Sequence, residues 1–176
     1  LEKAFLRSPL KFSAAVTSGF SRGRFHPVLH ESRAHLGTDY GAPLGAPVQA
    51  IGAGRVVFAG YKGDNGNMVQ LHHSNGYESL YLHLSRVLVR EGDRVESGDR
   101  IGLVGMTGLA TGPHLHFSIL DHGVYRNFEA LRRNLPSAEP VARADAAEFA
   151  ALCENVMTQL ASAATVAARA AAGSAT

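Results

Sequence analysis

Short apolar segments separated by glycine-rich turns dominate residues 47–104 and limit the folds open to this chain. The segments cover residues 48–51, 55–59, 68–72, 77–83, 87–89 and 100–104. Turn-forming sequences such as Gly52-Ala53-Gly54 and Ser74-Asn75-Gly76 lie between them, and no helical periodicity intervenes. Strands joined by such short connections pair antiparallel. We therefore expect a mainly β fold built from antiparallel sheets.

The regions on either side of these segments differ in character. Residues 1–17 are expected to lead into the domain, with some strand character around 12–17. Residues 18–27 are rich in turn-forming residues and too irregular for a helix. A strand that begins at His114 is expected to run to residue 120, turn at Asp121-His122-Gly123 and return over 124–126. A short helix is expected at 129–133.

A C-terminal α-helix is predicted from about residue 146 to 161, after a linker at 136–140 that begins and ends with proline. Apolar residues recur there at helical spacing, at Phe149, Leu152, Cys153, Val156 and Leu160. Asp145 can act as the N-cap, and Glu148, three residues later, completes a capping box. The sequence leaves open what covers the apolar face of this helix.

Charge and hydropathy argue against two classes of partner. The net charge is +2 and the Lys and Arg residues are scattered, whereas a nucleic-acid footprint needs a basic stripe. No run of about 18 apolar residues is present, so no membrane span is expected. Because the chain begins at Leu1, we expect it to be part of a longer protein whose targeting segment lies upstream or has been removed, with room for a membrane anchor in the missing N-terminal part.

Two of the nine histidines, His114 and His116, are separated by one residue after the helix-breaking pair Gly112-Pro113. Side chains two residues apart on a strand point to the same side of the sheet, so the two imidazoles are expected to lie side by side. Leu115 and Phe117 then point into a core. Paired imidazoles can bind a metal or flank a water molecule. The alternative is a pair of surface histidines without a function.

Three further residues have the chemistry of a metal site. His35 and Asp39 lie four residues apart, and Gly37 between them favours a loop or strand edge over a helix. An imidazole and a carboxylate this close form half of a zinc site, although a surface histidine beside a turn aspartate is the simpler interpretation. His83 lies in an apolar strand, where a lone histidine is usually solvated or satisfied in the core.

Ordered motifs surround these five residues. They are Ser18-Gly19-Phe20, Arg24-x-His26-Pro27, His35-x-Gly37-x-Asp39-Tyr40, Ala42-Pro43-x-Gly45-x-Pro47-Val48, Gly54-x-Val56-Val57, His73-x-x-Gly76-Tyr77, Tyr81-x-His83-Leu84-Ser85, Gly92-Asp93-x-Val95-x-x-Gly98 and Gly105-x-Thr107-Gly108-x-x-Thr111-Gly112-Pro113-His114-Leu115-His116-Phe117. In this order they resemble the lysostaphin-type zinc metallopeptidases, a family of bacterial cell-wall endopeptidases, over roughly residues 18–127. Within the family, Arg24-Phe25-His26-Pro27-Val28-Leu29, Arg33-Ala34-His35 and Leu135-Pro136 are most similar to the Gram-negative murein DD-endopeptidases.

The resemblance implies the lysostaphin-like peptidase fold and a role for each of the five residues. His35, Asp39 and His116 match the family's ligands to one Zn²⁺ ion per chain. His83 and His114 match two catalytic histidines beside the metal-bound water, and which of them is the base stays open. Tyr40 and Tyr81, near these motifs, are expected to be packing residues.

The resemblance also implies a substrate and a location. Gram-negative relatives cut the D-alanyl to meso-diaminopimelyl crosslink of peptidoglycan in the periplasm, so the expected partners are peptidoglycan stem peptides. Loops around residues 20–34, 60–67 and 106–111 are expected to wall the groove that holds them. The expected domains are a lead-in at 1–17, a zinc endopeptidase domain at 18–135, and a linker and C-terminal helix at 136–176.

Two other classes of function are alternatives to an enzyme. One is a catalytically inactive relative that binds or activates other cell-wall hydrolases, but all five site residues are present. The other is a biotinyl or lipoyl carrier, which needs a lysine at a hairpin tip, and Gly105-Met106-Thr107-Gly108 has none. The departures from the family pattern, at Ala53, Ser118 and Phe128, fall outside the five residues and bear on specificity within the family.

Overall fold

The computed structural model describes residues 5–26 and 31–133, apart from the side chains of 24–26, 31–33 and 75. All of these residues belong to the first of two units into which the chain divides, Leu1–Ala138. The C-terminal helix expected at 146–161, with its cap at Asp145 and Glu148, lies outside the described residues. Across the described ranges, no helix has the length and the apolar character needed to cross a membrane.

The described part of the chain is mostly β-strand, as predicted. The strands are β1 Val16–Ser18, β2 Ser21–His26, β3 Glu31–His35, β4 Thr38–Gly41, β5 Pro47–Gln49, β6 Gly54–Tyr61, β7 Asn67–His73, β8 Tyr77–Leu84, β9 Arg86–Val87, β10 Arg94–Val95, β11 Arg100–Leu103, β12 His114–Asp121 and β13 Val124–Arg126. The 3₁₀ turns Gly63–Asn65 and Ser74–Gly76 flank β7. The short α-helix α1, Phe128–Leu131, begins at the N-cap Asn127, whose side chain accepts hydrogen bonds from two backbone amides of the first turn.

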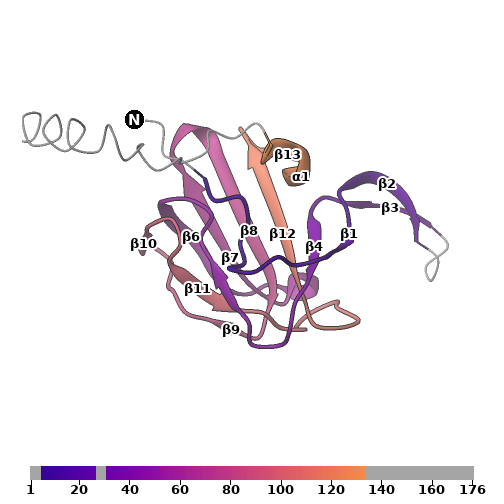
Figure 1. Cartoon of the computed structure of the whole chain (residues 1–176), viewed down its shortest axis with the longest axis horizontal. Coiled ribbons are helices and arrows are strands. Elements are labelled where there is room, and N and C mark those ends of the chain that lie inside the picture. Colours follow the sequence, from indigo (N-terminus) through magenta and orange to yellow (C-terminus); the bar gives the residue numbers. More distant parts are fainter. Residues whose placement is uncertain (1–4, 27–30, 134–176) are drawn as a thin grey trace, which may run out of the picture. The chain divides into compact units, whose positions relative to one another are not determined.

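Antiparallel pairing joins the strands into three sheets. The largest has the order β1-β4-β12-β8-β7-β6-β10, with β13 paired to β12. Figure 1 shows β4, β12, β8, β7 and β6 side by side in this sheet, with β11 and β9 forming part of a second layer. That second sheet has the order β5-β11-β9, and β2 and β3 form a separate two-stranded ribbon. The antiparallel prediction is therefore confirmed.

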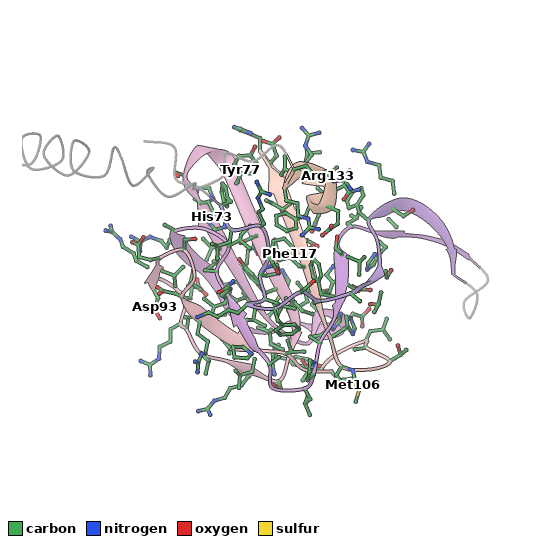
Figure 2. All side chains as sticks on the ribbon, in the orientation of Figure 1. His73, Tyr77, Asp93, Met106, Phe117 and Arg133 are labelled. Carbon is green, nitrogen blue, oxygen red and sulfur yellow. The ribbon has the colours of Figure 1, made fainter. Side chains whose placement is uncertain are left out.

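Strand β12 separates the hydrophobic core from the face that carries the paired histidines. Leu115 and Phe117 are fully buried, whereas His114 and His116 point to the other side and are half-buried, as the alternation predicts. The ring of Phe117 contacts that of Phe128 edge-on, with 4.7 Å between the ring centroids. Figure 2 shows Phe117 among side chains in the interior of the fold. Burial of one face of β12 fixes its register, since a shift by one residue would exchange the two faces.

Two strands lie where the sequence analysis expected irregular structure or a turn. β2 occupies a region expected to be turn-rich, and it pairs with β3, so that Ser21 lies opposite His35. Its polar sequence, Ser21-Arg22-Gly23-Arg24, has no apolar alternation, which is why the pattern did not predict a strand. β10 is only two residues long and pairs with the start of β6. In both cases pairing with a neighbouring strand overrides a weak local preference.

A buried chain of hydrogen bonds ties the β5–β6 connection to the large sheet. His73 Nδ1 lies 2.9 Å from the carbonyl oxygen of Ala53, and its Nε2 lies 2.7 Å from the hydroxyl of Ser79. Ser79 contacts the hydroxyl of Tyr81, which accepts a hydrogen bond from the backbone amide of Ile51. A carbonyl only accepts, so His73 donates its Nδ1 proton to Ala53, while the hydroxyl of Ser79 donates to Tyr81. The network therefore fixes the orientation of the buried His73 ring.

The network predicts a specific acid sensitivity of folding. Burial lowers the pKa of His73, and the hydrogen bond to the carbonyl of Ala53 offsets only part of this effect. The unfolded chain, with an ordinary histidine pKa of about 6.5, then binds this proton more readily than the native state, so stability falls as pH drops below about 6.5. Urea unfolding of the metal-free protein measures the free energy of unfolding. The wild type should exceed His73→Gln in this quantity by more at pH 7.5 than at pH 5.5. An equal difference at both pH values would contradict the prediction.

Candidate metal centre

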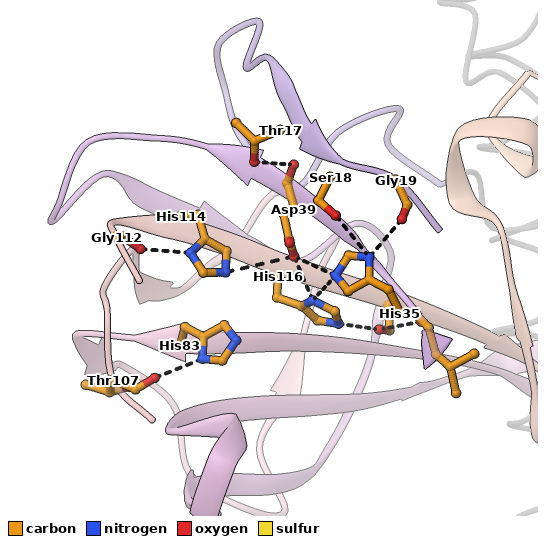
Figure 3. Close-up of polar contacts among 12 residues, drawn as sticks. Thr17, Ser18, Gly19, His35, Asp39, His83, Thr107, Gly112, His114 and His116 are labelled. Carbon is orange, nitrogen blue, oxygen red and sulfur yellow. Dashed lines mark hydrogen bonds and ion pairs between the residues drawn. The ribbon is translucent and has the colours of Figure 1, made fainter. Parts of the chain in front are cut away.

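Three adjacent structural elements bring the candidate ligands to one point. His35 ends β3, Asp39 lies in β4, and His116 lies opposite Asp39 on β12. Asp39 Oδ1 is 2.7 Å from His116 Nδ1 and 3.1 Å from His35 Nε2, and the two nitrogens are 3.2 Å apart. The three residues form a group whose ligand atoms all lie within 4.8 Å of one another. Figure 3 shows the side chains of His35, Asp39 and His116 turned toward one another. The structure thus brings together residues that are far apart in sequence.

The hydrogen bonds around the two imidazoles favour a cation between them. His35 Nδ1 lies 2.8 Å from the carbonyl of Gly19, which can only accept, so this nitrogen carries the proton. His116 Nε2 lies 3.1 Å from Ser118 Oγ, whose own proton goes to the carbonyl of Leu36. Both rings therefore turn the lone pair of their other nitrogen toward Asp39. Two imidazole nitrogens and a carboxylate are a usual ligand set for catalytic zinc, which leaves a fourth position open.

The carboxyl group of Asp39 is held in its charged form. Partial burial alone would raise its pKa, but hydrogen bonds and charge interactions with His116 and His35 outweigh burial and hold the pKa well below its ordinary value. The group is therefore a carboxylate throughout the neutral pH range. A permanent negative charge at the meeting point of two imidazoles is the environment that a divalent cation prefers.

His83 reaches the site through an irregularity in β8. Strand β8 contains one extra residue opposite the segment Asn67 to Val69 of β7, which makes a β-bulge. His83 lies in this part of β8 and adopts φ = 60°, which is rare for residues other than glycine. Bulges and positive φ values of this kind re-aim side chains at functional sites. His83 is 8% exposed, and its Nδ1 donates to the carbonyl of Thr107 over 2.8 Å. Burial lowers the pKa of His83, and the Thr107 carbonyl offsets only part of that shift.

His114 is held in the same manner on the neighbouring strand. Its Nδ1 donates to the carbonyl of Gly112 over 2.8 Å, and its Nε2 lies 3.9 Å from Asp39 Oδ1. The ring centroids of His114 and His83 are 4.9 Å apart. Figure 3 shows the rings of His83 and His114 beside the group formed by Asp39 and His116. All five residues singled out in the sequence therefore lie in one place.

The other tyrosines and histidines near the motifs lie outside this cluster. Tyr40 and Tyr81 are buried in the core, as expected. Burial and a hydrogen bond to Glu129 raise the pKa of Tyr40, so it stays a neutral phenol. His72 is exposed on β7, and His122 is exposed at the β12–β13 turn.

Three residues of the site were not singled out for it from the sequence. Gly37 lies against the ring of His116, Ser118 contacts the Nε2 of that ring, and the Thr107 carbonyl holds His83. One signal was available for Ser118, because it follows His116 by two residues and therefore shares its face of the strand. The other two contacts could not be predicted from residue type, because Thr107 acts through its backbone carbonyl and Gly37 acts by having no side chain.

Because the His116 ring lies against Gly37, we expect a larger residue at position 37 to disturb the metal site. A Cβ atom there would overlap His116 Nε2 and Ser118 Oγ, so Gly37→Ala must displace the imidazole. We expect zinc affinity to fall by at least about 10-fold. This is the effect of losing an outer partner, meaning a group that hydrogen-bonds a metal ligand on the side away from the metal. Chelator competition measures this. Gly23→Ala is the control, since a Cβ there meets nothing within 4 Å. Equal zinc affinities of Gly37→Ala and wild type would contradict the steric argument.

Antiparallel sheets that present two imidazoles and a carboxylate, beside two further histidines, are typical of the metallopeptidase class. Residues 33–128 match peptidase family M23, and the chain belongs to that family. The match includes all five site residues, from His35 to His116.

Comparisons with individual proteins agree with this assignment. Peptidoglycan DD-endopeptidase ShyC of Vibrio cholerae is 44% identical over 160 residues, which cover 91% of this chain and 36% of ShyC. A solved zinc-containing peptidase from Vibrio cholerae is 40% identical with a TM-score of 0.68, and the match covers 72% of this chain and 39% of that one. The catalytic domain of lysostaphin from Staphylococcus simulans is 29% identical with a TM-score of 0.60, covering 68% of this chain and 92% of that domain.

These matches confirm the resemblance seen in the sequence, including its closeness to DD-endopeptidases, and the lysostaphin-like fold. The chain spans only about a third of the length of ShyC, since 36% of that relative is covered. Most of the lysostaphin catalytic domain, by contrast, is covered.

Proposed function

We propose that this chain is the catalytic part of a zinc-dependent endopeptidase that hydrolyses peptide crosslinks of peptidoglycan. The observation that carries the proposal is the convergence of His35, Asp39 and His116, with their ligand atoms within 4.8 Å of one another. The anchored tautomers of the two histidines and the ionised carboxylate suit Zn²⁺, and one relative is described as a zinc-containing peptidase.

In this proposal His35 Nε2, Asp39 Oδ1 and His116 Nδ1 hold one zinc ion. Zinc bound there would supply Lewis acidity, which polarises the scissile carbonyl and lowers the pKa of a water molecule to about 7. The protein supplies the orientation. Gly19 and Ser118 hold the two imidazole ligands from outside, and Asp39 contributes a charge that leaves the zinc site net positive.

We further propose that His83 and His114 are the catalytic residues that move protons. Each ring donates its Nδ1 proton to a backbone carbonyl, of Thr107 and Gly112 respectively, so each presents Nε2 to the site. His83, with its lowered pKa, is neutral at pH 7 and can accept a proton there. Such a group can take a proton from the attacking water and later return one to the leaving amine. Either ring, when protonated, stabilises charge on the tetrahedral oxygen.

The proposed substrate is the D-alanyl to meso-diaminopimelyl crosslink between stem peptides, and the proposed location is the periplasm of a Gram-negative bacterium. The names of the relatives support this, since ShyC and its counterparts ShyA and ShyB are peptidoglycan DD-endopeptidases. Two of the three loops expected to bind the stem peptide, around residues 60–67 and 106–111, contact each other next to Thr107, whose carbonyl holds His83. The backbone amide of Leu109 donates to the carbonyl of Asp64, which joins the two loops next to Thr107. Met106 and Leu109 expose apolar surface there.

The inactive-module alternative has less support, because it predicts the loss of at least one site residue. Removal and return of the metal tests the proposal directly. The zinc-loaded chain should convert dimeric muropeptides that carry this crosslink into monomers, as measured by mass spectrometry. Chelation should stop the reaction, and added zinc should restore it. A zinc-loaded, folded chain that releases no monomers would contradict the proposal.

A further inference from the structure

Ser118 lies on strand β12 and contacts the segment that follows His35 at the end of β3. It follows His116 on the same face of β12 and is 3% exposed. Its hydroxyl oxygen lies 3.1 Å from His116 Nε2 and donates to the carbonyl of Leu36 over 2.9 Å. Leu36 directly follows His35. One hydroxyl therefore contacts one metal ligand and the backbone next to another.

The donor and acceptor roles in this contact are fixed. A serine hydroxyl has a single proton, and the carbonyl of Leu36 uses it. Ser118 Oγ therefore accepts a hydrogen bond from His116 Nε2–H. This leaves the lone pair on His116 Nδ1, the nitrogen that lies 2.7 Å from Asp39 Oδ1. Without an acceptor at Nε2, the ring loses the preference for this tautomer and this orientation.

Close packing around the contact shows that the ring has little freedom. The space that Gly37 leaves open is filled by His116 and Ser118, since a Cβ at Gly37 would overlap atoms of both. Among the described side chains, Thr38 Oγ1 is the buried polar atom without a hydrogen-bond partner, so Ser118 Oγ and the His116 ring are not left unpartnered. The arrangement specifies one position of the imidazole.

We propose that Ser118 is a positioning residue for the metal centre. Its hydroxyl holds His116 in the Nε2–H tautomer with Nδ1 turned toward the zinc position, and it ties β12 to the segment that follows His35. This inference rests on the zinc site of the proposed function. Outer partners of metal-binding histidines change metal affinity by about 10- to 100-fold when removed.

The test compares zinc affinity, by chelator competition at pH 7.5, in purified chains with matched substitutions. Ser118→Ala should bind zinc about 10- to 100-fold more weakly than wild type. Ser118→Thr keeps the hydroxyl and should restore most of the affinity. Ser79→Ala is the control, because Ser79 is a fully buried serine that makes the same kind of contact, to His73 Nε2, within another network. It should lower the stability of the metal-free protein and leave zinc affinity unchanged.

Each outcome separates the inference from the proposed function. Equal zinc affinity of Ser118→Ala and wild type would overturn the role of Ser118 and leave the zinc site intact. So would an equal loss in Ser79→Ala, which would indicate general destabilisation, or a Ser118→Thr protein as weak as Ser118→Ala. A wild-type chain that binds no zinc would overturn the proposed function and this inference together.

Discussion

Replacement of His116 by alanine is expected to abolish zinc binding and muropeptide cleavage while the β fold is retained. His116 supplies one of three ligand atoms and lies 2.7 Å from the carboxylate of Asp39. Loss of an outer partner alone costs about 10- to 100-fold in affinity, so loss of a ligand should exceed the upper end of that range. Zinc content by plasma mass spectrometry and monomer release from crosslinked dimers measure the two effects.

The fold should survive this substitution because His116 faces away from the core. The neighbouring residues Leu115 and Phe117 are fully buried and keep β12 in register. Circular dichroism of His116→Ala should match that of wild type. His122→Ala is the matched control, since His122 lies just after the same strand and its side chain is 76% exposed. A His116→Ala chain that keeps stoichiometric zinc and full cleavage would show that the metal lies elsewhere.

Substitution of His83 or His114 should separate catalysis from metal binding. Neither residue belongs to the three-ligand group, so zinc content should stay at the wild-type value. Proton transfer by a positioned side chain contributes about 10²- to 10⁴-fold to a rate, so kcat for crosslink cleavage should fall by that factor. Asparagine is the appropriate replacement at His83, because it tolerates the positive φ of that position.

A double variant of His83 and His114 tests whether the two residues act together. If His83 and His114 act in one proton-transfer unit, the two losses should not multiply, because residues that act together are not additive. Wild-type rates in both single variants would remove the two residues from the mechanism. A loss of zinc in either single variant would instead make that residue a ligand.

The sequence predicted the orientation of β12 because alternation is a local property. His114 and His116 were expected on one face, with Leu115 and Phe117 opposite, and burial follows this pattern. The hairpin turn after Asp121 was also expected from its residues. It has positive φ at His122 and Gly123, as two-residue hairpin turns require.

The convergence of the five site residues was not predictable from spacing. Asp39, His116 and His83 come together because β4, β12 and β8 are neighbours in the sheet, and His35 ends β3 just before β4. Local periodicity does not reveal the order of strands in a sheet. Only the resemblance to known metallopeptidases joined them. The bulge that turns His83 inward, and the contact between Ser118 and His116, depend on pairing across strands and were visible only in the structure.

A zinc-edge anomalous diffraction map of the crystallised chain would locate the metal ion directly. We expect one strong peak per chain, at about 2.0–2.2 Å from His35 Nε2, Asp39 Oδ1 and His116 Nδ1. His83 and His114 should lie near the peak without bonding to it. A zinc-soaked crystal with no peak at this point, or with its peak bonded to other residues, would contradict the account.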